Sequence, residues 1–221
     1  MTTLAARIAL AILAFACAGA CRAQAGFDES ASARLLMAAR ANDLAAVDRA
    51  LADGASANAR NRIGETALLS ALKRNQGALA RRMVDAGTDV NLAAINGTTP
   101  LMAAAYSGDA PMVDLLIARH ASVDAVDRIG KTALIYAAGE GHAAVVKALL
   151  AQGVDVNRRY ANDLTLLMWA AGYGREDVVV LLLAAGADPA LKDNRGKTAA
   201  DIARDGHYDA TLARLASRGG T

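Results

Sequence analysis

Residues 127–159 read DRIGKTALIYAAGEGHAAVVKALLAQGVDVNRR, and the same pattern returns every 33 residues. Steps of 33 give NRIGETALLSALKRNQGALARRMVDAGTDVNLA from residue 61, AINGTTPLMAAAYSGDAPMVDLLIARHASVDAV from residue 94, and YANDLTLLMWAAGYGREDVVVLLLAAGADPALK from residue 160. The register holds without a gap across these segments. A fixed period of this length indicates a chain that stacks one supersecondary unit on the next. We therefore predict a solenoid.

Two positions of the repeat suit a turn followed by a helix. A threonine that can cap a helix by accepting a backbone N–H recurs in one phase: Thr66, Thr99, Thr132, Thr165 and Thr198. Two residues before each threonine the chain has a glycine, which suits a turn with positive φ: Gly64, Gly97, Gly130 and Gly196. Asp163 is the exception in this series. Pro100 fits the first helical position, where a missing N–H costs nothing.

Each unit is predicted to hold two helices of different thickness. The first is slim, so that neighbouring units can approach closely, because it is filled by alanines: Ala103, Ala104, Ala137, Ala138, Ala170 and Ala171. The second carries an aliphatic stripe such as Val145, Val146, Leu149 and Leu150. It ends at a glycine suited to the C′ position: Gly54, Gly87, Gly153 and Gly186. His120 replaces this glycine once, so we expect a more strained or differently built helix end there.

Two strings carry a family resemblance. G-x-T-A-L-x-x-A-A-x-x-G-H, from Gly130 to His142, and V-V-x-x-L-L-x-x-G-x-x-V-N, from Val145 to Asn157, resemble the ankyrin-repeat consensus. The resemblance implies an all-α ankyrin-repeat solenoid of about six helix–turn–helix repeats with β-hairpin tips. The chain departs from the family at its T-P-L-H motif, which reads T-A-L-L, T-P-L-M, T-A-L-I and T-L-L-M here, so the histidine that braces the hairpin in the family is absent.

The ankyrin-repeat domain is predicted over residues 28–218. Its units are 28–60, 61–93, 94–126, 127–159, 160–192 and 193–218. The first lacks the opening turn motif, and the last loses the long aliphatic stripe. Terminal repeats must turn a polar face to water, so we interpret these two atypical units as the N-terminal and C-terminal caps.

Residues 1–25 resemble a secretory signal peptide. Arg7 gives a positive start, Ile8 to Ala20 form an apolar run, and Ala23-Gln24-Ala25 has the small-residue pattern of a cleavage site. We expect cleavage between Ala25 and Gly26. Thirteen apolar residues are too few for a membrane span, which needs about 20.

Two alternatives remain open for this segment. Ala18-Gly19-Ala20-Cys21 resembles a degenerate lipobox, in which Cys21 would be lipidated, and the segment could also be an uncleaved anchor or a misread start. Both cysteines, Cys17 and Cys21, lie here, so cleavage before Gly26 would leave a cysteine-free protein, as suits an oxidising compartment. The bacterial-looking signal and the Ala- and Arg-rich composition favour the periplasm.

Charge and composition argue against several classes of function. The chain has a formal net charge of +2, and the residues after 25 carry 22 basic and 22 acidic side chains. A protein without net charge lacks the surplus of basic side chains that is typical of nucleic-acid-binding proteins. His120, His142 and His207 have no metal-ligand spacing, and we find no phosphate-loop or nucleophile motif. We expect a non-catalytic monomer without cofactor or metal, and interpret His142 as a turn residue.

The family binds protein partners on a concave surface made by the tips and the first helices. Carried onto this sequence, that surface predicts a partner-binding set: Arg62, Ile63, Glu65, Ile95, Asn96, Tyr106, Arg128, Ile129, Lys131, Glu140 and Tyr173. Bare isoleucines on successive turns favour a contact patch, although they could instead pack laterally on the next turn. Trp169 and Tyr136 share a phase and suit packing between repeats better than binding.

The sequence thus predicts an exported, periplasmic interaction module whose protein partner it does not identify. The alternative is a lipid-anchored envelope protein with a protective or structural role and no single defined partner.

Overall fold

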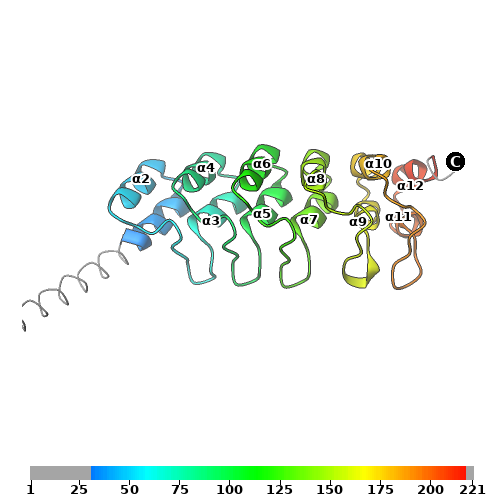
Figure 1. Cartoon of the computed structure of the whole chain (residues 1–221), viewed down its shortest axis with the longest axis horizontal. Coiled ribbons are helices and arrows are strands. Elements are labelled where there is room, and N and C mark those ends of the chain that lie inside the picture. Colours follow the sequence, from blue (N-terminus) through cyan, green and yellow to red (C-terminus); the bar gives the residue numbers. More distant parts are fainter. Residues whose placement is uncertain (1–30, 218–221) are drawn as a thin grey trace, which may run out of the picture.

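The computed structural model describes residues 31–217. The predicted cleavage site at Ala25 and Gly26, and the alternative lipidation site Cys21, lie outside the described residues. Helices follow one another in pairs that line up along the molecule (Figure 1). The first pair is residues 31–41 and α2 (Leu44–Ala52); the others are α3 (Ala67–Lys73) and α4 (Gly77–Asp85), α5 (Pro100–Ser107) and α6 (Ala110–Ala118), α7 (Ala133–Glu140) and α8 (Ala143–Leu150), α9 (Leu166–Gly172) and α10 (Glu176–Ala184), and α11 (Ala199–Asp205) and α12 (Asp209–Ala216).

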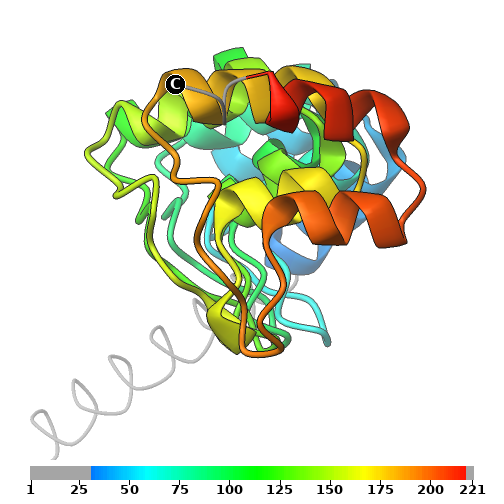
Figure 2. The ribbon, with the colours of Figure 1, turned by 90° about the vertical axis from the view of Figure 1, so that its right-hand side faces the viewer.

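The helices form two layers, from which loops project to one side (Figure 2). The first helices of the pairs make one layer and the second helices make the other, and neighbours within each layer are in contact. Between pairs the chain runs out into a tip and returns. Each tip is closed by backbone hydrogen bonds, such as those from the amide of Asp127 to Lys131 O and from Gly130 to Asp127 O. Over residues 31–217 the strand pairing consists of one isolated bridge, between Arg60 and Thr66.

The predicted threonine caps are confirmed. In each case the hydroxyl oxygen accepts the backbone N–H three residues on, and all but the half-buried Thr198 are buried: Thr66, Thr99, Thr132, Thr165 and Thr198. Such a cap contributes about 1 kcal/mol to helix stability. Pro100 occupies the first turn of α5, as predicted. The recurring threonine therefore sets where every first helix after the initial pair begins.

The predicted left-handed positions are also confirmed. The turn glycines have φ near 80°, and Asp163, which replaces one of them, has φ 58°. In that tip Asn162 is left-handed as well, with φ 61°, and residues Ala161–Asp163 form a short 3₁₀ helix (η1). His120 has φ 64° after α6, so an L-residue sits where the other units place glycine. This strained helix end matches the sequence-based expectation.

Alanine fills the contact between successive first helices. One alanine recurs at intervals of 33 residues, and five of its six occurrences have no exposed surface: Ala38 (8% exposed), Ala71, Ala104, Ala137, Ala170 and Ala203. Behind them lie the buried aliphatic side chains of the second helices, among them Val145, Val146 and Leu149. Together these residues form one continuous apolar core along the stack.

Polar side chains also join one pair of helices to the next. His142 Nε2 donates to Tyr106 O at 2.9 Å, and Arg175 Nε donates to Gly139 O at 2.7 Å, each at the C-terminal end of the preceding first helix. On the opposite edge, Asn157 accepts from the amide of Asp188 and donates to Gly186 O. Carbonyl groups at helix ends thereby gain partners from the following unit. Among residues 31–217 no helix is both long and apolar enough to cross a membrane.

Replacing His120 by glycine should stabilise the protein. The left-handed conformation costs an L-residue about 1–2 kcal/mol, and the flexibility of glycine in the unfolded chain offsets part of the gain. We expect His120→Gly to raise the free energy of unfolding by roughly 0.5–1 kcal/mol in urea titrations. The reciprocal control is Gly153→Ala, where nothing lies within 4 Å of the added Cβ, so that conformational strain alone should lower stability. Equal stabilities for His120→Gly and the wild type would contradict this account.

The contribution of Asp201 to stability should depend on pH. Hydrogen bonds from the Thr198 amide and hydroxyl, followed by one from Arg204, lower the pKa of Asp201 from 3.8 to about 2. A lowered pKa means that the carboxylate stabilises the fold above pH 4 and that this stabilisation is lost as the pH falls toward 2. The stability difference between wild type and Asp201→Asn should therefore shrink between pH 4 and pH 2 in urea titrations. A difference that stayed constant over this range would exclude the proposed linkage.

Candidate functional site

The tips and the exposed sides of the first helices form one surface, which we call the inner face. It runs along the molecule on the side where the loops of Figure 1 descend from the first-helix layer. The second helices form the opposite side and contribute nothing to it. Each repeat therefore presents one tip and one short helix surface to this face, at positions set by the 33-residue period.

Three isoleucines stand exposed on successive tips. Ile63, Ile95 and Ile129 are 57%, 55% and 68% exposed. The backbones of neighbouring tips are joined, because the Ile95 amide donates to Ile63 O at 3.0 Å, yet the side chains remain open to solvent. The side chains are thus partly covered, and Ile95 Cγ1 would lie 3.2 Å from a Cβ atom at Gly64 of the neighbouring tip, so that the alternative of lateral packing stays open.

Two tyrosines project from the first-helix layer. Tyr106, at the end of α5, is 55% exposed and meets Tyr136 edge-on, with ring centroids 6.0 Å apart. Tyr173, directly after α9, is 45% exposed and stacks on Trp169, with centroids 6.1 Å apart and planes at 9°. Each predicted contact tyrosine is thus held in place by an aromatic ring on the same face. Such rigid, half-exposed aromatic side chains are common in the energetically important parts of protein interfaces.

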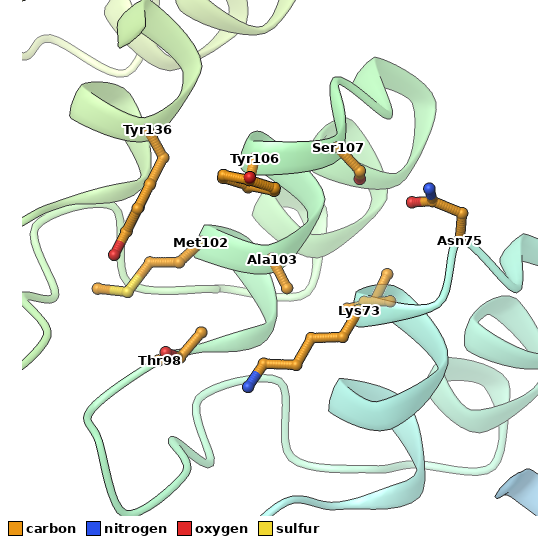
Figure 3. Close-up of a pocket in the computed structure, with 9 residues that line it drawn as sticks. Lys73, Asn75, Thr98, Met102, Ala103, Tyr106, Ser107 and Tyr136 are labelled. Atoms are coloured by element: carbon orange, nitrogen blue, oxygen red, sulfur yellow. The ribbon is translucent and has the colours of Figure 1, made fainter. Parts of the chain in front are cut away.

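A pocket of about 440 Å³ opens between α3, α5 and α7 (Figure 3). Tyr106 and Tyr136 lie at one side of it in this view, and Lys73 lies at the other. Ala103 and Met102 from α5 supply apolar lining, with Leu72, Asn75, Thr98 and Ser107 completing the wall. Ala103 shares its phase with Ser70, Tyr136 and Trp169, so the pocket lies where small residues stand at a position that the next two repeats fill with a large aromatic side chain.

Two further hollows lie on the inner face beside this pocket. One, of about 310 Å³, lies between the tips and includes Lys73, Ile63, Ile95 and Arg128 in its lining. The other, of about 370 Å³, is bordered by Met37 and shares Ile63 with the first hollow. The hollow between the tips thus has Lys73 in common with the pocket and Ile63 in common with the hollow bordered by Met37, and we call the three together the groove. Nothing in the periodicity distinguished this half of the stack in advance.

Glu65 is a correction to the predicted binding set. We expected it to be exposed at a tip, whereas it is 9% exposed and its carboxylate lies 2.7 Å from Lys73 Nζ. Asn61 Nδ2 donates to the second carboxylate oxygen at 3.3 Å. Glu65 directly precedes Thr66, the residue that caps α3, and its side chain points toward α3, where Lys73 lies. Glu65 thus holds Lys73 at the groove and presents little surface of its own.

The side chains of Lys131 and Tyr136 are held by contacts with neighbouring side chains. The Tyr136 hydroxyl donates to Asp127 Oδ2 at 2.5 Å, and burial, followed by this hydrogen bond, raises the pKa of Tyr136 well above that of an ordinary phenol. Lys131 Nζ lies 5.4 Å from the centroid of the Tyr136 ring and 4.7 Å from that of Trp169. Sequence reasoning assigned Trp169 and Tyr136 to packing between repeats. Lys131 bridges the two rings, and all three side chains also form part of the inner face.

The remaining predicted residues are placed as follows. Arg62 and Arg128 are exposed on the tips. Asn96 is exposed and its side chain accepts the Thr98 amide at 3.1 Å, which fixes the shape of its tip. Glu140 is half-buried at the end of α7, with its carboxylate 3.9 Å from Arg175. It therefore lies on the turn side of the helix pair and away from the groove.

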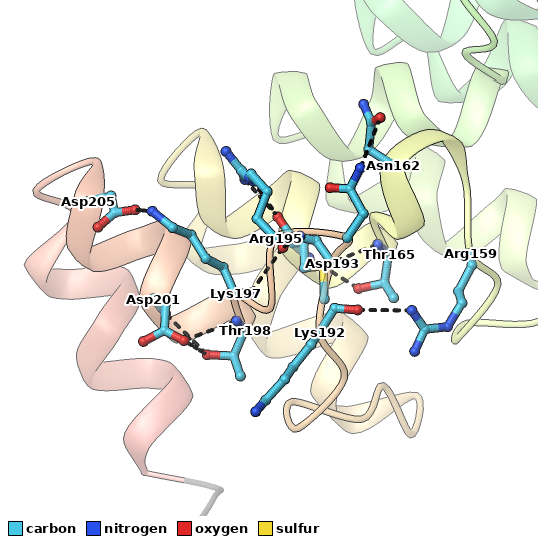
Figure 4. A network of polar contacts seen from close by, with 12 residues as sticks. Arg159, Asn162, Thr165, Lys192, Asp193, Arg195, Lys197, Thr198, Asp201 and Asp205 are labelled. Atoms are coloured by element: carbon cyan, nitrogen blue, oxygen red, sulfur yellow. Dashed lines mark hydrogen bonds and ion pairs between the residues drawn. The ribbon is translucent and has the colours of Figure 1, made fainter.

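The C-terminal tips carry a self-contained polar network (Figure 4). Asp193 accepts two bonds from the Arg195 guanidinium, at 2.7 and 2.9 Å, and Lys197 is paired with Asp205. Arg159 donates to Lys192 O and lies 3.9 Å from the Asp163 carboxylate. Arg159, Arg195 and Lys197 at this end of the inner face therefore each lie near a carboxylate, whereas Lys192 is exposed and forms no ion pair within residues 31–217.

The described residues also include no group of three or more histidine, aspartate or glutamate side chains placed to hold a metal ion. His142 lies at the start of α8, so its predicted turn position is confirmed, while His120 and His207 sit at left-handed turns.

Comparison with known proteins agrees with this architecture. A family model described as ankyrin repeats (3 copies) matches residues 35–127, 75–160 and 104–193, which together cover most of the chain. A search of curated proteins finds no match. Ankyrin repeats are generally protein–protein interaction modules and are typically non-catalytic. On the strength of the repeat pattern, the paired helices and this match, the chain belongs to the ankyrin-repeat family.

Proposed function

We propose that this protein is a non-catalytic module that binds one protein partner through its inner face. The observation that carries the proposal is the row of exposed apolar side chains there: Ile63, Ile95, Tyr106, Ile129 and Tyr173. Exposed apolar groups that gather on one face of a soluble protein indicate an interaction surface. Single apolar residues scattered over the surface would carry no such meaning.

The rigidity of the stack supports the same proposal. The tips are closed by backbone bonds, and the tyrosines rest on other rings. A surface that is already ordered loses little conformational entropy on binding, so more of the contact energy contributes to affinity. We therefore expect the partner to dock on the inner face without large rearrangement of this chain.

Charged substitutions on the inner face should abolish binding without unfolding the protein. We expect the triple variant Tyr106→Glu, Ile129→Asp and Tyr173→Glu to lose crosslinked partner in a pull-down from an envelope fraction. Its melting temperature should stay close to that of the wild type, because these side chains are largely exposed. The readouts are mass spectrometry of the crosslinked bands and thermal denaturation.

A matched control changes apolar residues of the other layer. Leu44 on α2 and Val180 on α10 are 39% and 38% exposed, and their replacement by glutamate should leave partner capture intact. Capture that survives the inner-face substitutions would refute the assignment of the surface. Loss of capture in the control variant as well would point to a general effect of charge.

We further propose that the protein is exported to the periplasm, on the basis of the sequence of residues 1–25. Expression of the full chain followed by intact-mass analysis should give a mature N-terminus at Gly26. Labelling with palmitate separates this outcome from lipidation of Cys21, which would support the lipid-anchored alternative. A chain that keeps Met1 and stays in the cytoplasm would overturn the proposal of export.

A further inference from the structure

The groove of the inner face points to a particular class of partner. We propose that its N-terminal half binds an acidic segment of the partner protein, with one aromatic or aliphatic side chain of that segment seated in the pocket between α3, α5 and α7. This inference rests on the proposed function and names the chemistry of the partner. It follows from the charges that border the groove and from the shape of the pocket.

Unpaired cations border the groove. Arg40, Arg62 and Arg128 are exposed, and within residues 31–217 none of them lies within 4.0 Å of a carboxylate oxygen. Arg40 lines the hollow bordered by Met37, and Arg128 lines the hollow between the tips. Arg62 lies on the tip next to Ile63. We call these three residues the arginine rim.

Carboxylates are scarce around the arginine rim. The Glu65 side chain is 11% exposed and is paired with Lys73. Asp127 is buried, and its side chain accepts hydrogen bonds from the Ile129 and Lys131 amides and from the Tyr136 hydroxyl. The arginine rim therefore lacks the carboxylate partners that Arg195 and Lys197 have in Asp193 and Asp205. Complementary charge on the partner would supply it and would favour an acidic segment.

The pocket adds an apolar requirement. Its volume of about 440 Å³ falls in the range of pockets that take up a small ligand or a large side chain. Tyr106, Tyr136, Met102 and Ala103 make its wall largely apolar. Figure 3 places Lys73 across the pocket from the two rings, so that an acidic residue beside the seated side chain would meet a cation. An anchor of this kind, surrounded by charge, is typical of specific protein contacts.

The phosphates of a nucleic acid could pair with the arginine rim, but they would give the exposed isoleucines no apolar partner. The residues after 25 carry equal numbers of basic and acidic side chains, and sequence-independent binding to phosphates needs a surplus of cations. Ile63, Ile95 and Ile129 on the tips would also lie against a charged backbone. The observations therefore favour an acidic protein segment.

Selection of short random peptides displayed on phage against the immobilised full chain tests the inference. Enriched peptides should be net acidic and should contain a Trp, Phe, Leu or Met. Their affinity, measured by fluorescence anisotropy, should fall as salt rises, because exposed charges are screened beyond about 10 Å at 0.1 M. Peptides with basic composition should not be enriched.

Two variants separate the parts of the site. Ala103→Trp fills the pocket with the residue that Trp169 supplies at the same phase, and leaves every charge in place. The triple variant Arg40→Glu, Arg62→Glu and Arg128→Glu reverses the arginine rim. We expect each to weaken the selected peptides by at least about tenfold, which corresponds to 1.4 kcal/mol.

The control applies the same charge change to the other layer. Arg49, Arg81 and Lys147 are exposed on α2, α4 and α8, and replacing all three by glutamate should leave peptide affinity unchanged. Circular dichroism confirms that each variant is folded. Enriched peptides without acidic bias, or an affinity indifferent to Ala103→Trp, would overturn the inference. So would a single-stranded oligonucleotide that binds as tightly as the peptides, because charge alone would then suffice.

The inference and the proposed function can fail separately. If the inner-face variants abolish capture of a crosslinked partner while acidic peptides fail to bind, the module still binds protein and the partner chemistry is wrong. If the peptides bind as expected and crosslinking yields no partner that depends on the inner face, the groove is real and the cellular role is misassigned.

Discussion

The close approach of successive first helices is the contact on which the rest of the structure depends. It is possible because one position in every unit is alanine, and five of its six occurrences have no exposed surface. A larger side chain there would push two neighbouring helices apart and open the core between their partners in the second layer. The same contact sets the distance between neighbouring tips, because each tip leads directly into the start of a first helix. The inner face is therefore a consequence of how small residues are distributed in the core.

Most of the fold could be predicted because its determinants repeat in phase. Thr132 caps α7, and Gly130 supplies the left-handed turn before it, for reasons of local backbone chemistry that each unit shares. His120 stood out as a departure from the pattern, and its strained conformation is what that departure implied. The same phase argument placed Ile129 on a tip, where its side chain is 68% exposed.

Parts of the site escaped prediction because they depend on residues that do not repeat. Glu65 is paired with Lys73, eight positions away, and its counterpart in the last unit, Lys197 with Asp205, has the charges exchanged. The groove arises from Ala103 standing where Tyr136 and Trp169 stand in the next units, and a cavity of this kind depends on side-chain volumes that periodicity ignores. Asn61, Asp127 and Asp193 share one phase and close their tips in the same way, a signal that a search for hydrogen-bonding residues could have found.

The hydrogen bonds between units join each unit to its immediate neighbours in the sequence. His142 and Arg175 each reach back to a carbonyl of the preceding first helix, and every side-chain hydrogen bond between helix pairs joins residues 29 to 36 positions apart. Other bonds run the opposite way, because Asn157 and Arg159 donate to carbonyl groups of the following unit. One 33-residue segment therefore carries both donors and acceptors for the units on its two sides. An in-frame gene duplication or deletion of a whole segment would regenerate these links at the new junction. The length of the inner face can thus change in evolution by whole repeats, while the two terminal caps stay as they are.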